Sequence, residues 1–270
     1  HKRRHRHNPH DWLKLHGPHI SQRARCLRII LIPGYSFRKC GSAGPFLAAM
    51  HNQARGMTTQ FAWKYDRGET VADAVVHILG VTMAIAAAAL LVVVAARDDD
   101  VTEVVAVIIY IAGFLAMFSF SAAYNLWPIS PIKWWLRRLD HSAIYLLIAA
   151  TYTAFMLPMQ GTAPTVLLAT IWLAALAGIT IKIFWPGRFD RTAVGLYLAM
   201  GWSCLFAIRP VIAALAPGTL WLIAAGGALY TIGVIFHVWR SLRFQNAIWH
   251  GFVLAAASCH YAAVLTSLGD

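Results

Sequence analysis

Seven long apolar stretches between residues 71 and 268 limit most strongly what this chain can fold into. They are 71–96, 101–127, 139–159, 165–184, 192–215, 220–239 and 247–268. An α-helix rises about 1.5 Å per residue, so about twenty residues cross a hydrocarbon core of about 30 Å. Lipid offers no partner for backbone N–H and C=O groups, which leaves the helix as the form for such segments. The sequence therefore predicts an all-α fold, a bundle of seven transmembrane helices.

The overall composition agrees with a membrane protein. Hydrophobic residues make up 59% of the 270 residues and charged residues only 13%. A soluble domain carries roughly a quarter charged residues. This composition argues against a soluble enzyme and predicts an integral membrane protein with several spans.

Basic residues alternate between the predicted loops. One set of loops and flanks carries Lys64, Arg67, Lys133, Arg137, Arg138, Lys182, Arg188, Arg191, Arg240 and Arg243. On the other side, Arg97 is followed by three aspartates, the 160–164 turn is uncharged, and the fifth loop, Ala-Pro-Gly-Thr, has only Arg209 nearby. Lysine and arginine are enriched in cytoplasmic loops. We therefore expect the amino terminus in the cytoplasm and the carboxyl terminus outside.

Residues 1–56 differ in kind from the rest of the chain. They are basic, rich in histidine and poor in apolar periodicity. Such a segment can attract nucleic acid or anionic lipid, but it cannot bury enough apolar surface to fold alone. We expect a disordered extension, with no nucleic-acid partner, before a membrane domain of residues 57–270. Because the chain begins with His and Met57 precedes the first helix, this extension is also interpreted as an artefact of start-site choice.

The four cysteines show no paired spacing. They are Cys26, Cys40, Cys204 and Cys259, and none forms a C-x-x-C motif. This pattern predicts neither a disulfide framework nor a thiolate metal site.

Polar side chains gather near the predicted cytoplasmic ends of four helices. They are Glu69, Asp73 and His77 in the first helix, Ser121 and Asn125 in the second, Asp140 and His141 at the start of the third, and Asn246, His250 and the deeper His260 in the seventh. A spacing of four places residues on one face of a helix. Polar groups inside hydrocarbon are costly and are by default candidates for function. We expect these side chains to share one layer of the bundle.

Each of these residues also has a structural interpretation. Asp140 and Asn246 are residue types that cap helices, and Glu69 in a first turn complements the helix dipole. A single intramembrane histidine such as His77 or His260 is more often bonded to a neighbouring helix than part of a site. Taken singly, the structural interpretation is favoured for most of them. Their convergence on one layer favours a functional cluster.

The motifs that carry these residues resemble the bacterial hemolysin III family. They are Glu69-x-x-x-Asp73-x-x-x-His77-x-x-Gly80, Ser121-Ala-Ala-Tyr-Asn125, the Asp140-His141-Ser142-Ala143-Ile144-Tyr145 block and Asn246-Ala-Ile-Trp249-His250. That family is grouped with the progestin and adipoQ receptors and the alkaline ceramidases. The resemblance covers the seven-helix region and implies a bacterial inner-membrane protein whose partners are membrane lipids.

The resemblance also implies a zinc site near the cytoplasmic face. In the superfamily one histidine of the second helix and two of the seventh bind the metal, next to a serine, and an aspartate of the third helix positions a zinc-bound water. Those positions are Asn125, Asn246 and His250 for the ligands, with Ser121 and Asp140 in the catalytic places. Two of the three ligand positions thus hold asparagine, whereas zinc prefers imidazole, thiolate or carboxylate.

Two arrangements are compatible with these departures. One is a rearranged metal site drawn from His77, His141, His250, His260 and Asp140. The other is a metal-free polar core in which Asn125, Asn246 and His250 bond one another, and it is favoured because it needs only partners within one layer.

Three functional classes remain open on these residues. The favoured one is a lipid-sensing or membrane-homeostasis protein, because the asparagines argue against a zinc hydrolase. The second is a zinc-dependent lipid amide hydrolase like the ceramidases. The third is a pore-forming cytolysin, which the family's name suggests and which the lack of a continuous polar stripe through any helix argues against.

Overall fold

The computed structural model describes residues 66–97, 99–187 and 189–268. The predicted extension 1–56, its boundary at Met57, and the cysteines Cys26 and Cys40 lie outside these residues. No strand occurs in the described part of the chain, so the all-α prediction is confirmed.

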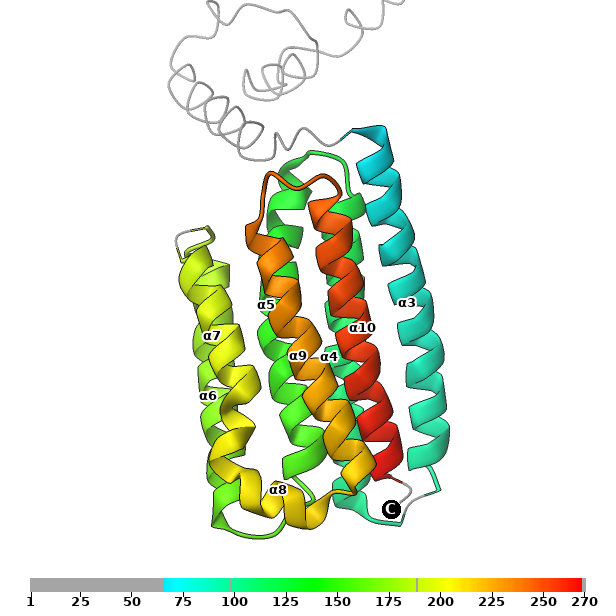
Figure 1. The fold of residues 1–270 in the computed structure, drawn as a ribbon, viewed down its shortest axis with the longest axis vertical. Helices are drawn as coiled ribbons and strands as arrows, with labels where there is room; N and C mark the ends of the chain where they lie inside the picture. The colour runs from blue at the N-terminus through cyan, green and yellow to red at the C-terminus, as the bar shows by residue number, and fades with distance from the viewer. Residues whose placement is uncertain (1–65, 98, 188, 269–270) are drawn as a thin grey trace, which may run out of the picture. The chain divides into compact units, whose positions relative to one another are not determined.

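Long helices run side by side along the bundle (Figure 1). They are α3 (Arg67–Ala95), α4 (Val101–Leu126), α5 (Pro131–Met156), α6 (Thr162–Phe184), α7 (Asp190–Trp202), α9 (Pro217–Val238) and α10 (Gln245–Ser267), with a 3₁₀ turn η2 (Ser203–Ala207) and a short α8 (Ile208–Ala214) between α7 and α9. Within the described residues, six segments are long and apolar enough to cross a membrane, the α7–α8 segment Asp190–Ala214 counting as one. The chain is therefore an integral multi-pass protein. The count of seven spans and the orientation stay predictions.

Helix α5 is the long helix outside that set of six. Lys133, Arg137, Arg138 and Asp140 crowd its first ten residues and lower its hydropathy. The expectation that Asp140 and His141 open this helix is wrong, because α5 begins at Pro131. The Ser130 side chain accepts a hydrogen bond from the Lys133 N–H, and proline is well suited to the first turn. The charged residues interrupt the apolar stretch, but the helix continues through them. Asp140 therefore lies inside α5 and does not cap it.

The fifth apolar stretch is not one continuous helix. The Tyr152 hydroxyl of α5 donates to the Met200 carbonyl over 2.8 Å and accepts from the Cys204 N–H over 2.8 Å. A side chain that inserts into the backbone ladder bends or breaks a helix. Helix α7 accordingly gives way to the 3₁₀ turn η2 at Ser203.

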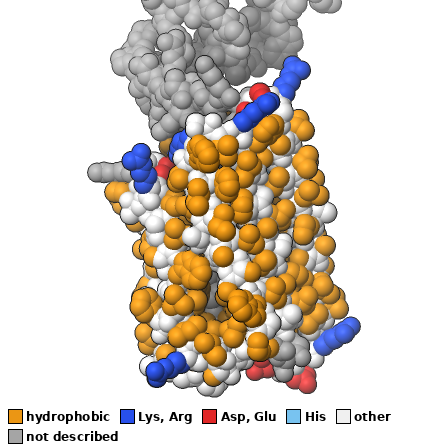
Figure 2. Space-filling view, in the orientation of Figure 1, with side chains coloured by type: hydrophobic (Ala, Val, Ile, Leu, Met, Phe, Trp, Pro, Cys, Tyr) orange, Lys and Arg blue, Asp and Glu red, His pale blue; other side chains and the backbone are white. Residues whose placement is uncertain are grey.

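The lateral face of the bundle is apolar, and charged side chains lie at its two ends (Figure 2). Large hydrophobic residues are exposed on several helices, including Phe206 at 91% and Trp221 at 77%. A soluble monomer rarely exposes so wide an apolar surface, and lipid would cover it. This surface agrees with a protein that lies in a bilayer.

Helix pairing brings four helix ends to one end of the bundle. Helix α4 packs between α3 and α5, and α10 packs against α9, α3 and α5. Helices α3, α5 and α10 begin at the same end, where α4 finishes (Figure 1). We call it the α3-start end. Close packing sets these positions, since a Cβ on Gly113 of α4 would lie 2.6 Å from the Cβ of Ala150 on α5.

Candidate functional site

The start of helix α3 is tied to the start of α10. Glu69 Oε2 accepts from the Asp66 N–H, and Asp66 Oδ1 accepts from the Glu69 N–H, which together form a capping box. Glu69 Oε1 accepts from the Phe244 N–H over 3.0 Å, directly before α10. The Glu69 N–H and the nearby Arg243 guanidinium lower the pKa of the exposed Asp66 carboxyl. Glu69 therefore positions two helices instead of joining the polar residues deeper in the bundle.

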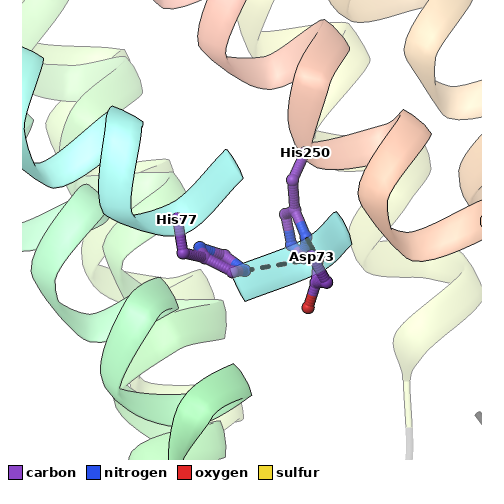
Figure 3. Close-up of side chains that lie close together, drawn as sticks. All are labelled: Asp73, His77 and His250. Carbon is purple, nitrogen blue, oxygen red and sulfur yellow. Dashed lines mark hydrogen bonds and ion pairs between the residues drawn. The ribbon is translucent and has the colours of Figure 1, made fainter. Parts of the chain in front are cut away.

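One turn further along α3, Asp73 and His77 meet His250 from α10 (Figure 3). Asp73 Oδ1 lies 2.8 Å from His250 Nδ1 and 3.6 Å from His77 Nε2. The two imidazole rings have their centroids 4.3 Å apart. The side chains of Asp73 and His250 are 13% and 12% exposed, and that of His77 is 4% exposed. A single carboxylate oxygen thus faces two ring nitrogens in a largely buried place.

Two asparagines extend this contact to helix α4. The Asn246 amide donates to Asp73 Oδ2 over 2.9 Å and to Asn125 Oδ1 over 3.2 Å. The Asn125 amide donates to the Ser121 carbonyl over 2.9 Å. We refer to Asp73, His77, Asn125, Asn246 and His250 as the polar cluster. It joins α3, α4 and α10 near the α3-start end.

One buried side-chain atom of the polar cluster has no hydrogen-bond partner. His77 Nε2 is buried and unpartnered, because 3.6 Å from Asp73 Oδ1 is too long for a hydrogen bond. A buried polar atom left unpaired costs about 1–3 kcal/mol. Such an atom in a well-packed protein calls for an explanation.

Asp140 and Ser121 lie beside the polar cluster on α5 and α4. The Asp140 carboxyl interacts electrostatically with Ser121, His141 and His250. Asp140 Oδ2 is 3.3 Å from His141 Nδ1, but that nitrogen is nearer to the Arg137 carbonyl, at 2.8 Å. Asp140 is therefore held by α5 with its carboxyl toward the same region, while His141 is occupied by its own helix.

His260 and Asn246 depart from their expected places in different ways. His260 Nε2 lies 3.2 Å from the Ile223 carbonyl and against Gly226 of α9, away from the polar cluster. His260 is therefore a histidine bonded to a neighbouring helix, which is the structural interpretation given above for a single intramembrane histidine. Asn246 does not cap α10, because the cap position is Phe244 and the Asn246 amide turns inward.

A second charged group at the α3-start end had no place in the predicted cluster. Lys182 of α6 is 3% exposed, and its Nζ lies 2.6 Å from Asp190 Oδ1 of α7. Arg137 of α5 contacts Asp190 Oδ2 over 2.8 Å. In the sequence Lys182 was counted among the loop charges. Its place inside an apolar stretch was the signal that it has a buried partner.

The asparagine positions do not fit a zinc ion of the family type. Asn246 turns its amide nitrogen toward Asp73 and Asn125, and an amide N–H₂ is a donor that cannot bind a cation. Asn125 offers only an amide oxygen, a weak ligand for zinc. Of Asn125, Asn246 and His250, only His250 presents a suitable atom. We therefore derive no chemical step through a metal at those three positions.

The Asp73–His250 pair itself has a chemical property. An imidazole whose Nδ1–H is held by a carboxylate keeps its Nε2 as an acceptor, and this is how a histidine is oriented as a general base. The sequence did not predict that His250 contacts Asp73. The signal for it was an aspartate at helical spacing between Glu69 and His77.

Comparison with known proteins places most of the helical region in one family. The family model described as "Haemolysin-III related" matches residues 67–261. The "Hemolysin-3 homolog" of Bacillus subtilis (strain 168) is 37% identical over 73% of this chain and 93% of its own length. "Hemolysin-3" of Bacillus cereus is 37% identical over 73% and 90%. The human "Monocyte to macrophage differentiation factor" is 30% identical over 58% and 67%. No solved structure matches the chain.

Proposed function

The chain belongs to the hemolysin III family, and on that premise we propose that it is a lipid-sensing, membrane-homeostasis protein of the bacterial inner membrane. In this proposal seven helices span the bilayer, because α5 is added to the six apolar segments. The α3-start end faces the cytoplasm, in line with the basic residues of the loops there. The polar cluster then lies just below the inner surface.

The observation that carries the proposal is the polar cluster itself. Asp73, Asn125 and Asn246 join three helices by hydrogen bonds inside a bundle whose outer surface is apolar. Polar groups inside an apolar bundle are costly, which makes them candidates for function by default. A lipid whose amide, hydroxyl or phosphate group competes for these bonds would favour one packing of α3 against α10 over another. A ligand shifts a conformational equilibrium only by such differential contacts.

Native mass spectrometry of the full chain in nanodiscs tests this proposal. The nanodiscs hold phosphatidylethanolamine, phosphatidylglycerol, cardiolipin and ceramide in known proportions. We expect one class to be retained well above its bulk fraction, and Asn246→Ala to lower that retention at least several-fold. Ser258→Ala is the matched control, because Ser258 lies on α10 and bonds its own helix at Leu254. Equal retention of all classes, or no difference between Asn246→Ala and the control, would contradict lipid sensing.

A lipid amide hydrolase is the second candidate, and the Asp73–His250 pair is the observation that favours it. The oriented imidazole of His250, together with Ser121 and Asp140, provides side chains that can transfer protons to and from a lipid amide. If the reconstituted protein releases fatty acid from ceramide and His250→Gln abolishes that release, the protein is a hydrolase and not a lipid sensor. Ion flux from the same liposomes would instead identify the pore that the family's name suggests.

A further inference from the structure

We propose that Asp73, His77 and His250 bind a divalent transition-metal ion, with a ligand set that shares only His250 with the positions that the family resemblance implies. The ion would lie between α3 and α10 instead of between α4 and α10. The proposal concerns the geometry of these three side chains and does not depend on lipid sensing.

The spacing of the three ligand atoms is close to what one ion requires. Asp73 Oδ1, His77 Nε2 and His250 Nδ1 all lie within 4.8 Å of one another. Zinc binds imidazole nitrogen and carboxylate oxygen at about 2.0–2.2 Å, so tetrahedral ligands are separated by about 3.3 Å. The Asp73–His77 distance of 3.6 Å already fits, and the Asp73–His250 distance of 2.8 Å must widen slightly. The separation between His77 Nε2 and His250 Nδ1, which is at most 4.8 Å, has to approach the same value.

The unpartnered nitrogen of His77 points independently to a ligand. His77 is 4% exposed, and its Nε2 faces Asp73 without a hydrogen bond. Asp73 Oδ1, which this nitrogen faces, is already in contact with His250 Nδ1 over 2.8 Å. A cation between the two rings and the carboxylate would give His77 Nε2 its missing partner. It would also balance a carboxylate charge that lies among apolar helices.

The donor set selects the class of metal. Two imidazoles and one carboxylate are the ligands of catalytic zinc sites with an open fourth position, and of non-haem iron sites. Calcium and magnesium prefer oxygen ligands throughout. Two donors come from one face of α3 at a spacing of four, and the third comes from α10.

The asparagines acquire a positioning role in this site. The Asn246 amide holds Asp73 Oδ2 over 2.9 Å, which leaves Oδ1 directed at both histidines. The Asn125 oxygen accepts from the same amide and keeps it in place. Partners of this kind orient a ligating carboxylate and strengthen metal binding. The two residues that replace the implied ligands thus support a set of ligands displaced toward α3.

Metal content of the full chain, purified in detergent after growth with zinc, tests the proposal. The histidines of residues 1–56 add exchangeable zinc, so the readout is the difference between the wild type and each variant. We expect His77→Gln and His250→Gln to lose close to one zinc per chain. His260→Gln is the matched control, because it removes a buried histidine of α10 that lies outside the polar cluster, and we expect it to lose none. Circular dichroism and elution volume verify that each variant is folded.

Cobalt titration of the metal-stripped wild type gives a second readout that needs no variant. Four-coordinate Co²⁺ absorbs strongly in the visible region, whereas six-coordinate Co²⁺ on loose histidines absorbs weakly. We expect a strong band that saturates at one equivalent and disappears on addition of Zn²⁺. Absence of that band, or zinc loss that is the same in His77→Gln and His260→Gln, would overturn the proposal. Zinc that is lost in Asn125→Ala but kept in His77→Gln would also overturn it, by placing the metal at the family positions.

The outcome is distinguishable from that of the lipid proposal. Both metal measurements are made in detergent without added lipid, so they fail or succeed independently of lipid retention in nanodiscs.

Discussion

At the scale of single residues, the polar cluster is defined by one carboxylate with two histidines. Asp73 contacts His250 and faces His77, while its second oxygen is held by Asn246. None of these contacts with α10 follows from one helix alone, because the partners come from α3 and α10. The side chain that the sequence marked only as part of a polar stripe is the centre of the cluster.

Replacing Asn125 and Asn246 by histidine tests whether these two residues decide where the metal binds. With His250, Asn125→His and Asn246→His supply the three imidazoles that the family resemblance implies. Three imidazoles bind zinc far more strongly than two amides and one imidazole. We expect the double variant to bind zinc at least ten-fold more tightly than the wild type, as measured by competition with a chelator.

The control for this experiment is His77→Gln in the same background. Zinc binding should then no longer depend on His77, because the ion has moved toward α4. Unchanged affinity in the double variant would show that the helices do not bring residues 125, 246 and 250 to a common point.

At the scale of helices, small residues set how closely the elements approach. Gly113 of α4 meets Ala150 of α5, and a Cβ there would also come within 3.5 Å of the α5 backbone. At Gly178 of α6, a Cβ would overlap the ring of Tyr145. These contacts fix the distance between α4, α5 and α6, and with it the place of Asn125 and Asp140.

Gly113→Ala is expected to destabilise the bundle. The Ala150 Cβ and the α5 backbone cannot yield as a flexible side chain would, so the two helices must separate. Forcing a methyl group into a packed contact costs about 1–3 kcal/mol. We expect a lower midpoint of thermal unfolding in detergent.

Gly195→Ala is the matched control on helix α7, where a Cβ would meet nothing within 4 Å. Alanine favours a helix over glycine by about 1 kcal/mol, so this variant should be as stable as the wild type or more so. A drop in the unfolding midpoint of the same size in both variants would mean that the α4–α5 contact is not limiting.

At the scale of the whole molecule, the arrangement is an apolar bundle with polar groups at its ends. Basic residues near one end of each of α5, α6, α7 and α10 lie at the α3-start end. Two of them, Arg137 and Lys182, both contact Asp190 there. The opposite end carries Asp99, Asp100 and Glu103. This asymmetry predicts which end faces the cytoplasm.

Cysteine labelling in intact cells measures that orientation. In a cysteine-free background, Ser241→Cys lies between α9 and α10 and Gln160→Cys lies between α5 and α6, both at exposed positions. We expect a membrane-impermeant maleimide to label Gln160→Cys in intact cells and Ser241→Cys only after lysis. The reverse pattern would place the α3-start end outside, and labelling of both in intact cells would contradict an odd number of spans between them.

Much of the fold was predictable because its main constraint is local. Each apolar stretch must form a helix in lipid, and the stretches at 101–127, 165–184 and 247–268 end within a few residues of α4, α6 and α10. The length of α5 was not predictable from hydropathy, since Ser130 and Pro131 start a helix well before the apolar residues begin. The break after Trp202 depends on Tyr152, which lies on another helix.

The sequence by itself determined that the chain contains several membrane helices, to which family it belongs, and that polar residues lie at fixed spacings along those helices. Only the tertiary structure decided which of them meet. It joined Asp73 to His250 and Asn246, and it left Glu69 at a helix start and His260 against α9. The physical reason is that spacing within a helix fixes a face, whereas a partner on another helix depends on rotation and shift. These are set by close packing between helices, at contacts such as that of Gly113 with Ala150.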